Sequence, residues 1–150
     1  MALSVNSKAP DFSLESTSGT TFNLSKDMAG KACVIYFYPK DFTPGCTQEA
    51  CSFRDSHHVL ADLNIPVFGI SKDSIETHLK FKEAHNLPFE LLSDPTGKVC
   101  KAYKALIPIL KVPKRITYLL NNEHQIEAVF DSMFDAAGHI KAMMKAVEKN

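Results

Sequence analysis

The sequence of 150 residues lacks an excess of either charge, because Lys and Arg together number 17 and so do Asp and Glu. A nucleic-acid-binding surface needs a basic excess, so this balance argues against nucleic acid as a partner. No apolar run approaches the roughly 18 residues that span a bilayer. The polar start, residues 1–8, has no apolar signal core. We therefore expect a cytoplasmic protein without a membrane segment.

Repeats, low-complexity tracts and linkers are absent too, and the length suits one domain, residues 1–150, with its own hydrophobic core. Apolar residues make up 45% and charged residues 23% of the chain, which is ordinary for a globular protein. The four cysteines, at positions 33, 46, 51 and 100, contain no C-x2-C pair. In a reducing compartment they are not a structural disulfide framework by default. Packed thiol, metal ligand and redox group remain open as their roles.

Strand and helix patterns alternate along the chain. The predicted extended segments cover residues 9–14, 32–38, 65–70, 89–92, 115–120 and 126–130, and the predicted helices cover 47–63, 74–85, 98–103 and 134–147. The early crossovers imply parallel strands, and the late hairpin around Asn121-Asn122 adds an antiparallel pair. We therefore predict an α/β protein with a thioredoxin-like fold, a mixed central sheet flanked by helices.

Two packing predictions follow from these patterns. Ile75, Leu79 and Ala84 are compatible with one apolar face of the helix over 74–85. Phe134 is expected in the core together with the phenylalanines at 68, 81, 89 and 130. The stretch over residues 105–114, with two prolines and a dense apolar patch, is the least readable part of the chain.

The clearest chemical signal lies around Cys46. Thr43 is a good N-cap, and Pro44 stands at the first helical position, where its missing N–H is harmless. Cys46 then falls in the first turn, near unpaired N–H groups and the positive end of the helix dipole. That environment favours the thiolate, which is the reactive form. The helix also follows a central strand, at the sheet edge where active sites gather in α/β folds.

Cys51 lies five residues further along the same helix. Ideal helical geometry separates such Cα atoms by roughly 8–9 Å, whereas a disulfide usually needs less than about 7 Å. A bond between Cys46 and Cys51 therefore requires the first helical turns to unwind. The apolar stripe through Cys46 continues at positions 50, 53, 57, 60 and 61, and should pack on the sheet.

These residues resemble the active-site signature of the peroxiredoxins. The matching motifs are Pro39-x3-Thr43-x2-Cys46, the opening Ala9-Pro10-Asp11-Phe12, the turn Ser93-Asp94-Pro95-x-Gly97-Lys98, and Arg115 at the start of a strand. Thr47-x-Glu49 and Cys51 resemble the bacterioferritin-comigratory-protein or PrxQ subfamily. The likeness covers nearly the whole chain. It departs from the family before Arg115, where the segment 107–114 lacks the expected glycines and looks shortened.

The resemblance implies a thiol peroxidase acting on hydrogen peroxide or alkyl hydroperoxides without a cofactor or metal. Cys46 would attack the peroxide and become a sulfenic acid, with Arg115 stabilising the developing charge. The Thr43 hydroxyl and the Cys46 N–H would bind the peroxide oxygens, Pro39 would shield the sulfur, and Glu49 would orient Arg115.

The same resemblance implies how the enzyme is recycled. Cys51 would condense with oxidised Cys46, and thioredoxin or glutaredoxin would reduce the disulfide by exchange. One chain suffices for this cycle, so we expect a monomer.

Several alternatives stay open. Cys51 on a helix can be a packed residue, which would make the protein a one-cysteine peroxidase reduced directly by an external thiol. A dithiol oxidoreductase would carry C-x2-C instead of the C-x4-C found here. A zinc-binding or redox-sensing module lacks the paired ligands it would need. We expect Cys33 to pack in the core, and Cys100 to be either a packed residue or a backup thiol.

Overall fold

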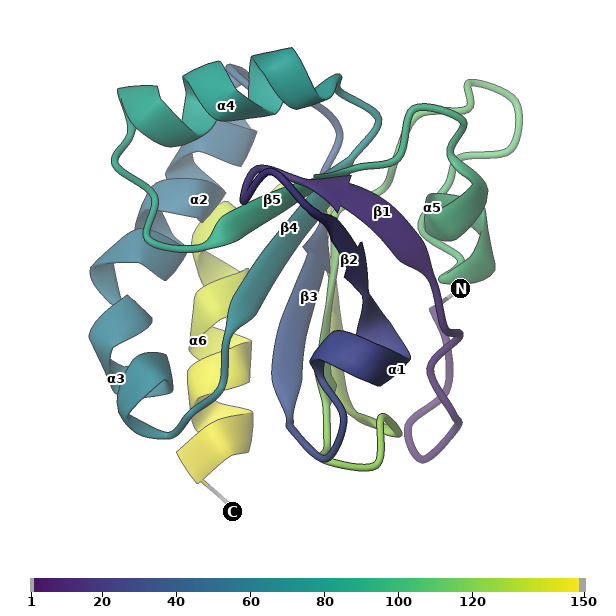
Figure 1. Cartoon of the computed structure of the whole chain (residues 1–150), viewed down its shortest axis with the longest axis vertical. Coiled ribbons are helices and arrows are strands. Elements are labelled where there is room, and N and C mark those ends of the chain that lie inside the picture. The colour runs from purple at the N-terminus through teal and green to yellow at the C-terminus, as the bar shows by residue number, and fades with distance from the viewer. Residues whose placement is uncertain (1, 149–150) are drawn as a thin grey trace.

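A seven-stranded sheet forms the centre of the computed structural model, which describes residues 2–148 (Figure 1). Its strands are β1 (Ser13–Ser16), β2 (Thr21–Asn23), β3 (Cys33–Phe37), β4 (Val67–Ser71), β5 (Glu90–Ser93), β6 (Ile116–Leu120) and β7 (Ile126–Asp131). Their order across the sheet is β2-β1-β5-β4-β3-β6-β7. β3, β4 and β5 run parallel, and every other neighbouring pair is antiparallel. The predicted mixed sheet is therefore confirmed.

Helices cover both faces of this sheet. They are α1 (Leu24–Asp27), α2 (Pro44–Asp55), α3 (His57–Asp62), α4 (Ile75–Ala84), α5 (Lys98–Ala102) and α6 (Ala136–Glu148). Buried side chains of α2, α3, α4 and α6 share one apolar cluster with one face of the sheet. Those of α1 and α5 belong to the cluster on the other face. Figure 1 shows α2 and α3 one after the other, with α6 alongside them, on the first of these faces.

The central strand β3 places the functional segment. All five of its residues are fully buried, and successive side chains alternate between the two apolar clusters, as strand geometry requires. The buried run in the sequence therefore predicted its position correctly. The chain leaves β3 at its carboxyl end, passes through residues 38–43 and enters α2.

The helix predicted over residues 47–63 is wrong in its continuity. The chain forms two helices, α2 and α3, separated at Ser56. Adjacent poor helix formers, Asp55 and Ser56, lie at the break, where their side chains can compete for backbone groups. Because the helical register restarts there, Ala61 is exposed instead of continuing the buried stripe of α2.

The predicted apolar face of α4 is also wrong. Leu79 is 46% exposed and Ala84 is exposed, while His78 and Phe81 form the buried side. His78 can be buried because both of its ring nitrogens have oxygen partners. Phe134, predicted in the core, is 99% exposed because α6 begins only at Ala136.

Two elements were not predicted, β2 and α1. Each spans only three or four residues, too few to show a period. Asn23 ends β2 and also caps α1, accepting a hydrogen bond from the Lys26 backbone N–H at 2.9 Å. The segment 105–114 forms turns closed by a bridge between Leu106 and Pro113.

Gly69 in β4 offers a direct stability test of this core. A Cβ at this position would stand 2.8 Å from Cζ and 2.9 Å from the hydroxyl of Tyr36, and 2.9 Å from Leu91 Cδ2. Gly69→Ala should therefore lower the free energy of unfolding by about 1–3 kcal/mol, because fully buried neighbours must move. Urea denaturation followed by circular dichroism measures this loss.

The matched background is Tyr36→Val, which removes the ring that the new methyl group would meet. In that background Gly69→Ala should cost clearly less. An equal loss in both backgrounds would show that the ring of Tyr36 does not limit the space at this position.

Candidate active site

The first turn of α2 carries the predicted nucleophile. Thr43 is the N-cap by its backbone angles, φ −90° and ψ 150°, and Pro44 follows at the first helical position. Cys46 therefore stands third in the helix, where backbone N–H groups have no intrahelical acceptor. Among residues 2–148, the Thr43 side chain accepts no capping bond. Its hydroxyl instead donates to the Lys40 carbonyl at 2.8 Å.

Arg115, just before β6, contacts the Cys46 sulfur of α2. Its Nη2 donates to Cys46 Sγ at 3.3 Å, its Nη1 to Glu49 Oε1 at 2.7 Å, and its Nε to the Met133 carbonyl at 3.0 Å. Cys46 is only 1% exposed and Arg115 only 5%. The guanidinium is therefore held on all three sides, and one of its charged edges faces the sulfur. A fork of this geometry binds a charged sulfur and a carboxylate together.

Glu49 is fully buried beside Arg115. Burial raises the pKa of its carboxyl to about 8, while the Arg115 charge and hydrogen bond act in the opposite direction. The carboxyl is thus held in place through one oxygen, Oε1. Within the described chain, Oε2 has no hydrogen-bond partner, and His139 Nδ1 lies 3.4 Å from it. No sequence pattern pointed to His139, which α6 contributes from far along the chain.

Cys51 lies on α2 but outside this buried cluster. It is half-buried, and all four cysteines are free in the described part of the chain. The helix around it is intact from Pro44 to Asp55. The structure therefore does not bring Cys51 to Cys46, as expected for two residues five positions apart on a helix.

The remaining cysteines are packed in the core. Cys33 and Cys100 are fully buried, on the opposite sheet face from Cys46. Burial raises the pKa of Cys33 to about 12, and it also raises that of Cys100. Both thiols are therefore poor nucleophiles.

Pro39, two residues after the end of β3, lines a surface pocket. The pocket, about 360 Å³ in volume, is also lined by Leu110, Val112 and Pro113 from the turn segment before β6. Leu110 is 69% exposed. Apolar surface thus lies next to the loop that precedes α2.

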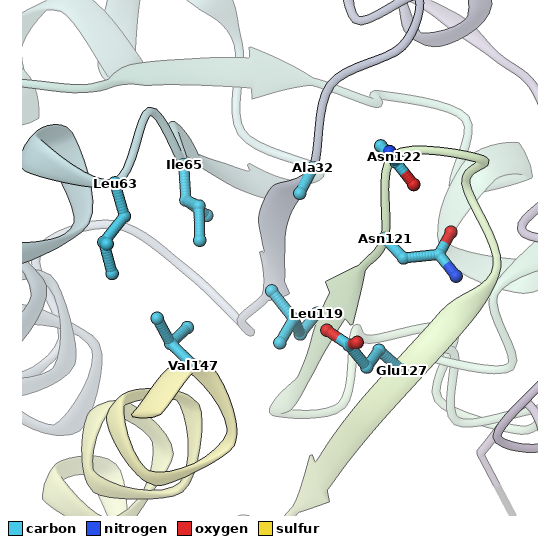
Figure 2. Close-up of a pocket in the computed structure, with 8 residues that line it drawn as sticks. All are labelled: Ala32, Leu63, Ile65, Leu119, Asn121, Asn122, Glu127 and Val147. Carbon is cyan, nitrogen blue, oxygen red and sulfur yellow. The ribbon is translucent and has the colours of Figure 1, made fainter. Parts of the chain in front are cut away.

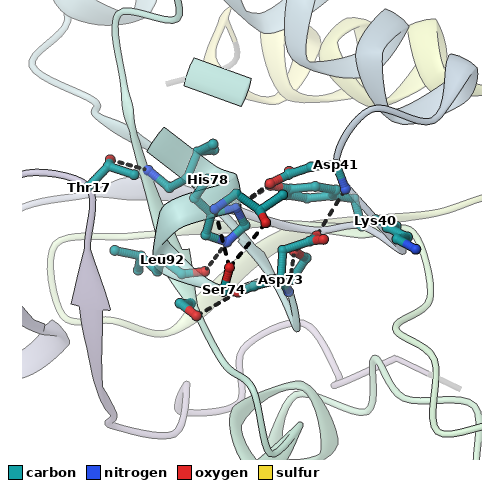
Figure 3. A network of polar contacts seen from close by, with 12 residues as sticks. Thr17, Lys40, Asp41, Asp73, Ser74, His78 and Leu92 are labelled. Carbon is teal, nitrogen blue, oxygen red and sulfur yellow. Dashed lines mark hydrogen bonds and ion pairs between the residues drawn. The ribbon is translucent and has the colours of Figure 1, made fainter. Parts of the chain in front are cut away.

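A second buried network fixes the loop before α2 (Figure 3). The Asp41 carboxylate accepts from the Tyr38 hydroxyl at 2.5 Å and lies 2.6 Å from His78 Nδ1, and the other ring nitrogen of His78 is 3.0 Å from the Leu92 carbonyl. Asp73 Oδ2 accepts from the Asp41 backbone N–H at 2.9 Å. The loop is therefore tied to both α4 and β5 just ahead of the nucleophile. Sequence reasoning missed this network, because its members are scattered along the chain.

Asp41, Asp73 and His78 are also the group in the described chain whose ligand atoms, all within 4.8 Å of one another, could hold a metal ion. Their atoms already bond one another and their neighbours. These hydrogen bonds, which fix the loop before α2, are enough to explain why the three side chains lie together.

A further pocket, of about 340 Å³, lies at the other end of the sheet (Figure 2). Ala32, just before β3, lines it, whereas Cys46 follows the far end of that strand. Its other lining residues are apolar on one side and polar on the other: Leu63, Ile65, Leu119 and Val147, with Asn121, Asn122 and Glu127.

Within residues 2–148, every helix is too short or too polar to span a lipid bilayer.

Comparison with known proteins gives consistent matches. A family model described as the AhpC/TSA family matches residues 5–129. A putative peroxiredoxin bcp of Coxiella burnetii is 42% identical over 146 residues, which cover 93% of this chain and 95% of that protein. Peroxiredoxin Bcp of Bacillus subtilis is 53% identical over 103 residues, covering 69% of this chain and 65% of that protein.

Solved structures agree in fold. The crystal structure of peroxidoxin BcpB from Mycobacterium tuberculosis matches with a TM-score of 0.89 and 30% identity, over 97% of this chain and 96% of that one. The bacterioferritin comigratory protein of Xanthomonas campestris, described with an alkyl peroxide reduction activity, matches with a TM-score of 0.82 and 28% identity, over 96% and 99%. The thioredoxin-like fold predicted from the sequence is therefore confirmed.

Proposed function

Because the chain belongs to the AhpC/TSA family, among the bacterioferritin-comigratory-protein or PrxQ peroxiredoxins, it is a thiol-dependent peroxidase, and we propose that Cys46 is its peroxidatic nucleophile. The observation that carries this assignment is the contact of Arg115 Nη2 with the buried Cys46 sulfur at 3.3 Å. The sulfur also lies in the first turn of α2, at the positive end of the helix. Both features favour the thiolate, the form that attacks peroxide.

The proposed first step is an attack of the Cys46 thiolate on one peroxide oxygen. An S–O bond forms and the O–O bond breaks, so the sulfur is oxidised to a sulfenic acid and the other oxygen leaves as an alcohol or water after taking a proton. Arg115, next to the sulfur, would stabilise the charge that moves onto the leaving oxygen. Glu49 would hold the guanidinium in this orientation through its 2.7 Å bond.

Thr43 and Pro39 would shape the substrate side. The Thr43 hydroxyl donates its hydrogen bond to the Lys40 carbonyl. Its oxygen lone pairs can therefore accept a hydrogen bond from the peroxide O–H. The Cys46 backbone N–H is the matching donor, since it has no intrahelical acceptor. Pro39 would limit the access of water to the sulfur. Hydrogen peroxide and alkyl hydroperoxides both fit this small set of contacts.

We propose Cys51 as the resolving residue. Its thiol would attack the Cys46 sulfenic acid and release water, giving an intramolecular disulfide. The first turns of α2 must open for this step, because an intact helix holds the two Cα atoms roughly 8–9 Å apart. Thioredoxin or glutaredoxin would then reduce the disulfide. This cycle needs only one chain, which supports a monomer. We also propose that the chain is a single domain that works in the cytoplasm, in keeping with its similarity to the bacterial Bcp proteins.

The Cys51→Ser variant tests the resolving step. The first oxidation of Cys46 should proceed at the rate of the parent protein, because Cys51 lies outside the Arg115 cluster. Steady-state peroxide consumption with thioredoxin and its reductase should fall by about a hundredfold, because no disulfide forms for exchange. Stopped-flow and coupled NADPH assays measure the two rates.

The control for this test is Ser52→Ala on the same helix. It should leave both rates within about twofold, since within residues 2–148 the Ser52 hydroxyl donates to the Gln48 carbonyl of its own helix and not to the active-site cluster. Full turnover by Cys51→Ser would support the one-cysteine cycle, in which an external thiol reduces Cys46 directly. Mass spectrometry of the oxidised parent protein would show the Cys46–Cys51 bond itself.

A further inference from the structure

A continuous line of contacts runs from the nucleophile into α6. Cys46 Sγ touches Arg115 Nη2 at 3.3 Å, Arg115 Nη1 touches Glu49 Oε1 at 2.7 Å, and Glu49 Oε2 lies 3.4 Å from His139 Nδ1. Glu49 and His139 are both fully buried, and Cys46 is 1% exposed. His139 is thus the far end of the active-site network, without contact to the sulfur itself.

The partners of His139 define where it can hold a proton. Its Nε2 lies 2.8 Å from the Ser132 carbonyl, which can only accept, so Nε2 carries a hydrogen. Its Nδ1 faces two oxygens, Thr117 Oγ1 at 2.7 Å and Glu49 Oε2 at 3.4 Å. In the neutral ring Nδ1 accepts from the Thr117 hydroxyl. A proton in the space between Nδ1 and Oε2 would satisfy the carboxylate oxygen that has no hydrogen-bond partner in the described chain.

The surroundings favour keeping this pair close to neutral. Burial raises the pKa of Glu49 to about 8 and lowers that of His139. The other charged groups that act on His139 are Arg115 just before β6, Asp131 at the end of β7 and Asp135 before α6. A proton shared by two such coupled groups belongs to the pair and not to either residue alone.

Charge balance links this proton to the sulfur. With Cys46 as thiolate, Arg115 as cation and Glu49 as carboxylate, one negative charge is left uncompensated, and a proton on the Glu49–His139 pair removes it. Once the sulfur is a neutral sulfenic acid, Arg115 and Glu49 balance without that proton. An uncompensated buried charge is costly, so the thiolate state should bind the proton and the oxidised state should release it.

We propose that Glu49 and His139 form a buried proton site that is filled while Cys46 is a thiolate and emptied when peroxide oxidises it. This rests on the proposed role of Cys46. In the balanced step, thiolate, hydroperoxide and the proton of the pair give sulfenic acid and alcohol. The sulfur loses two electrons to the peroxide oxygens, and the released proton matches the one that the leaving alkoxide needs. Whether this proton moves directly or through the solvent, the protein and peroxide together take up almost no net proton from the solution.

The test counts protons during a single oxidation. In this test the word parent means the Cys51→Ser variant, which stops at the sulfenic acid, and not the unsubstituted protein. It is mixed with one equivalent of hydrogen peroxide in weakly buffered solution with a pH indicator. The pH is set about one unit above the midpoint of Cys46 alkylation, so that most of the sulfur is thiolate. The parent should take up close to no protons. Glu49→Gln, made in the parent, should take up about one proton per sulfenic acid, because its amide cannot hold the proton. His139→Asn should also take up more protons than the parent, because the remaining Glu49 carboxyl has lost the partner with which it shares the proton.

A second readout separates this role from structural damage. Glu49→Gln removes the negative charge beside Arg115 and should lower the midpoint of Cys46 alkylation by iodoacetamide. His139→Asn removes the ring that shares the proton with Glu49, so the Glu49 charge is less well compensated. The midpoint should therefore rise by about one unit, which means tenfold less thiolate at a pH below it. Phe130→Leu is the packing control. The Phe130 ring packs edge-on against His139, with the two ring centroids 4.7 Å apart, and has no group that titrates. This variant should behave as the parent.

The outcomes are distinguishable. Proton uptake near one by the parent, or near zero by either amide variant, would overturn the proton site. Midpoints that shift in the same direction for both amide variants would overturn it too. Mass spectrometry reports separately on the proposed function: if peroxide adds no oxygen to Cys46 of the parent, the nucleophile assignment fails, and the proton site fails with it.

Discussion

Serine in place of Cys46 should bring peroxide consumption down to the background rate, a loss of about a thousandfold or more. A serine hydroxyl stays protonated at neutral pH, so neither the helix end nor Arg115 can supply a charged nucleophile. The shape of the site should survive, since Cys46 and serine differ by one atom in a fully packed position. Peroxide consumption with an excess of dithiol, followed by a colorimetric peroxide assay, measures the loss.

Cys33→Ala and Cys100→Ala are the controls for that loss. Both thiols are buried on the opposite face of the sheet, and burial holds their pKa values far above neutral. Each variant should lose some stability through the small cavity it leaves, but should keep its peroxidase rate within about twofold at a temperature where it is folded. Activity that persists in Cys46→Ser and disappears in Cys100→Ala would move the nucleophile to the other face of the sheet.

Arg115→Gln should slow the oxidation of Cys46 by peroxide by about a hundredfold. The amide cannot donate a charged hydrogen bond to Sγ, and removing one donor that stabilises a developing charge typically costs this much. The substitution also leaves the buried Glu49 carboxyl without the cation that faces it at 2.7 Å, so the free energy of unfolding should fall by about 3 kcal/mol. Stopped-flow oxidation kinetics and chemical denaturation measure the two effects.

Arg115→Lys distinguishes charge from geometry. Lysine keeps the charge but has no planar fork, so it cannot reach Cys46, Glu49 and the Met133 carbonyl together. Its oxidation rate should lie between those of the parent protein and Arg115→Gln. Arg54→Gln, also on the active-site face of the sheet, is the matched control and should leave the oxidation rate unchanged. A rate for Arg115→Lys equal to that of the parent protein would mean that charge alone is enough.

The parts of the site that sequence could predict are those set by neighbours in the chain. Pro44 fixes the helix start, and the unbroken apolar run from Ala32 to Tyr38 marks the buried strand ahead of it. Arg115 was predicted through a resemblance, and the structure places it against Cys46. Its contact with Glu49 spans 66 positions, so no local pattern specifies it.

What sequence could not predict depends on tertiary partners. His78 and His139 look like ordinary polar helix residues, yet both are fully buried, because oxygens from other elements accept from or donate to their rings. Leu79 and Phe134 show the converse, since their apolar side chains are exposed. Helical periodicity says which residues share a face. It does not say which face the sheet covers when polar side chains can be satisfied there.

The break at Ser56 also affects the timing of the proposed cycle. α3 starts a new set of hydrogen bonds, and its buried Leu60 holds it to the sheet, so unwinding that begins at Cys46 can stop at the end of α2. At most the 12 residues of that helix need to be rebuilt after each reduction. A helix of that length re-forms in about a microsecond or less, whereas enzymes typically turn over about one to a thousand times per second. Rebuilding the helix therefore takes a negligible part of each turnover.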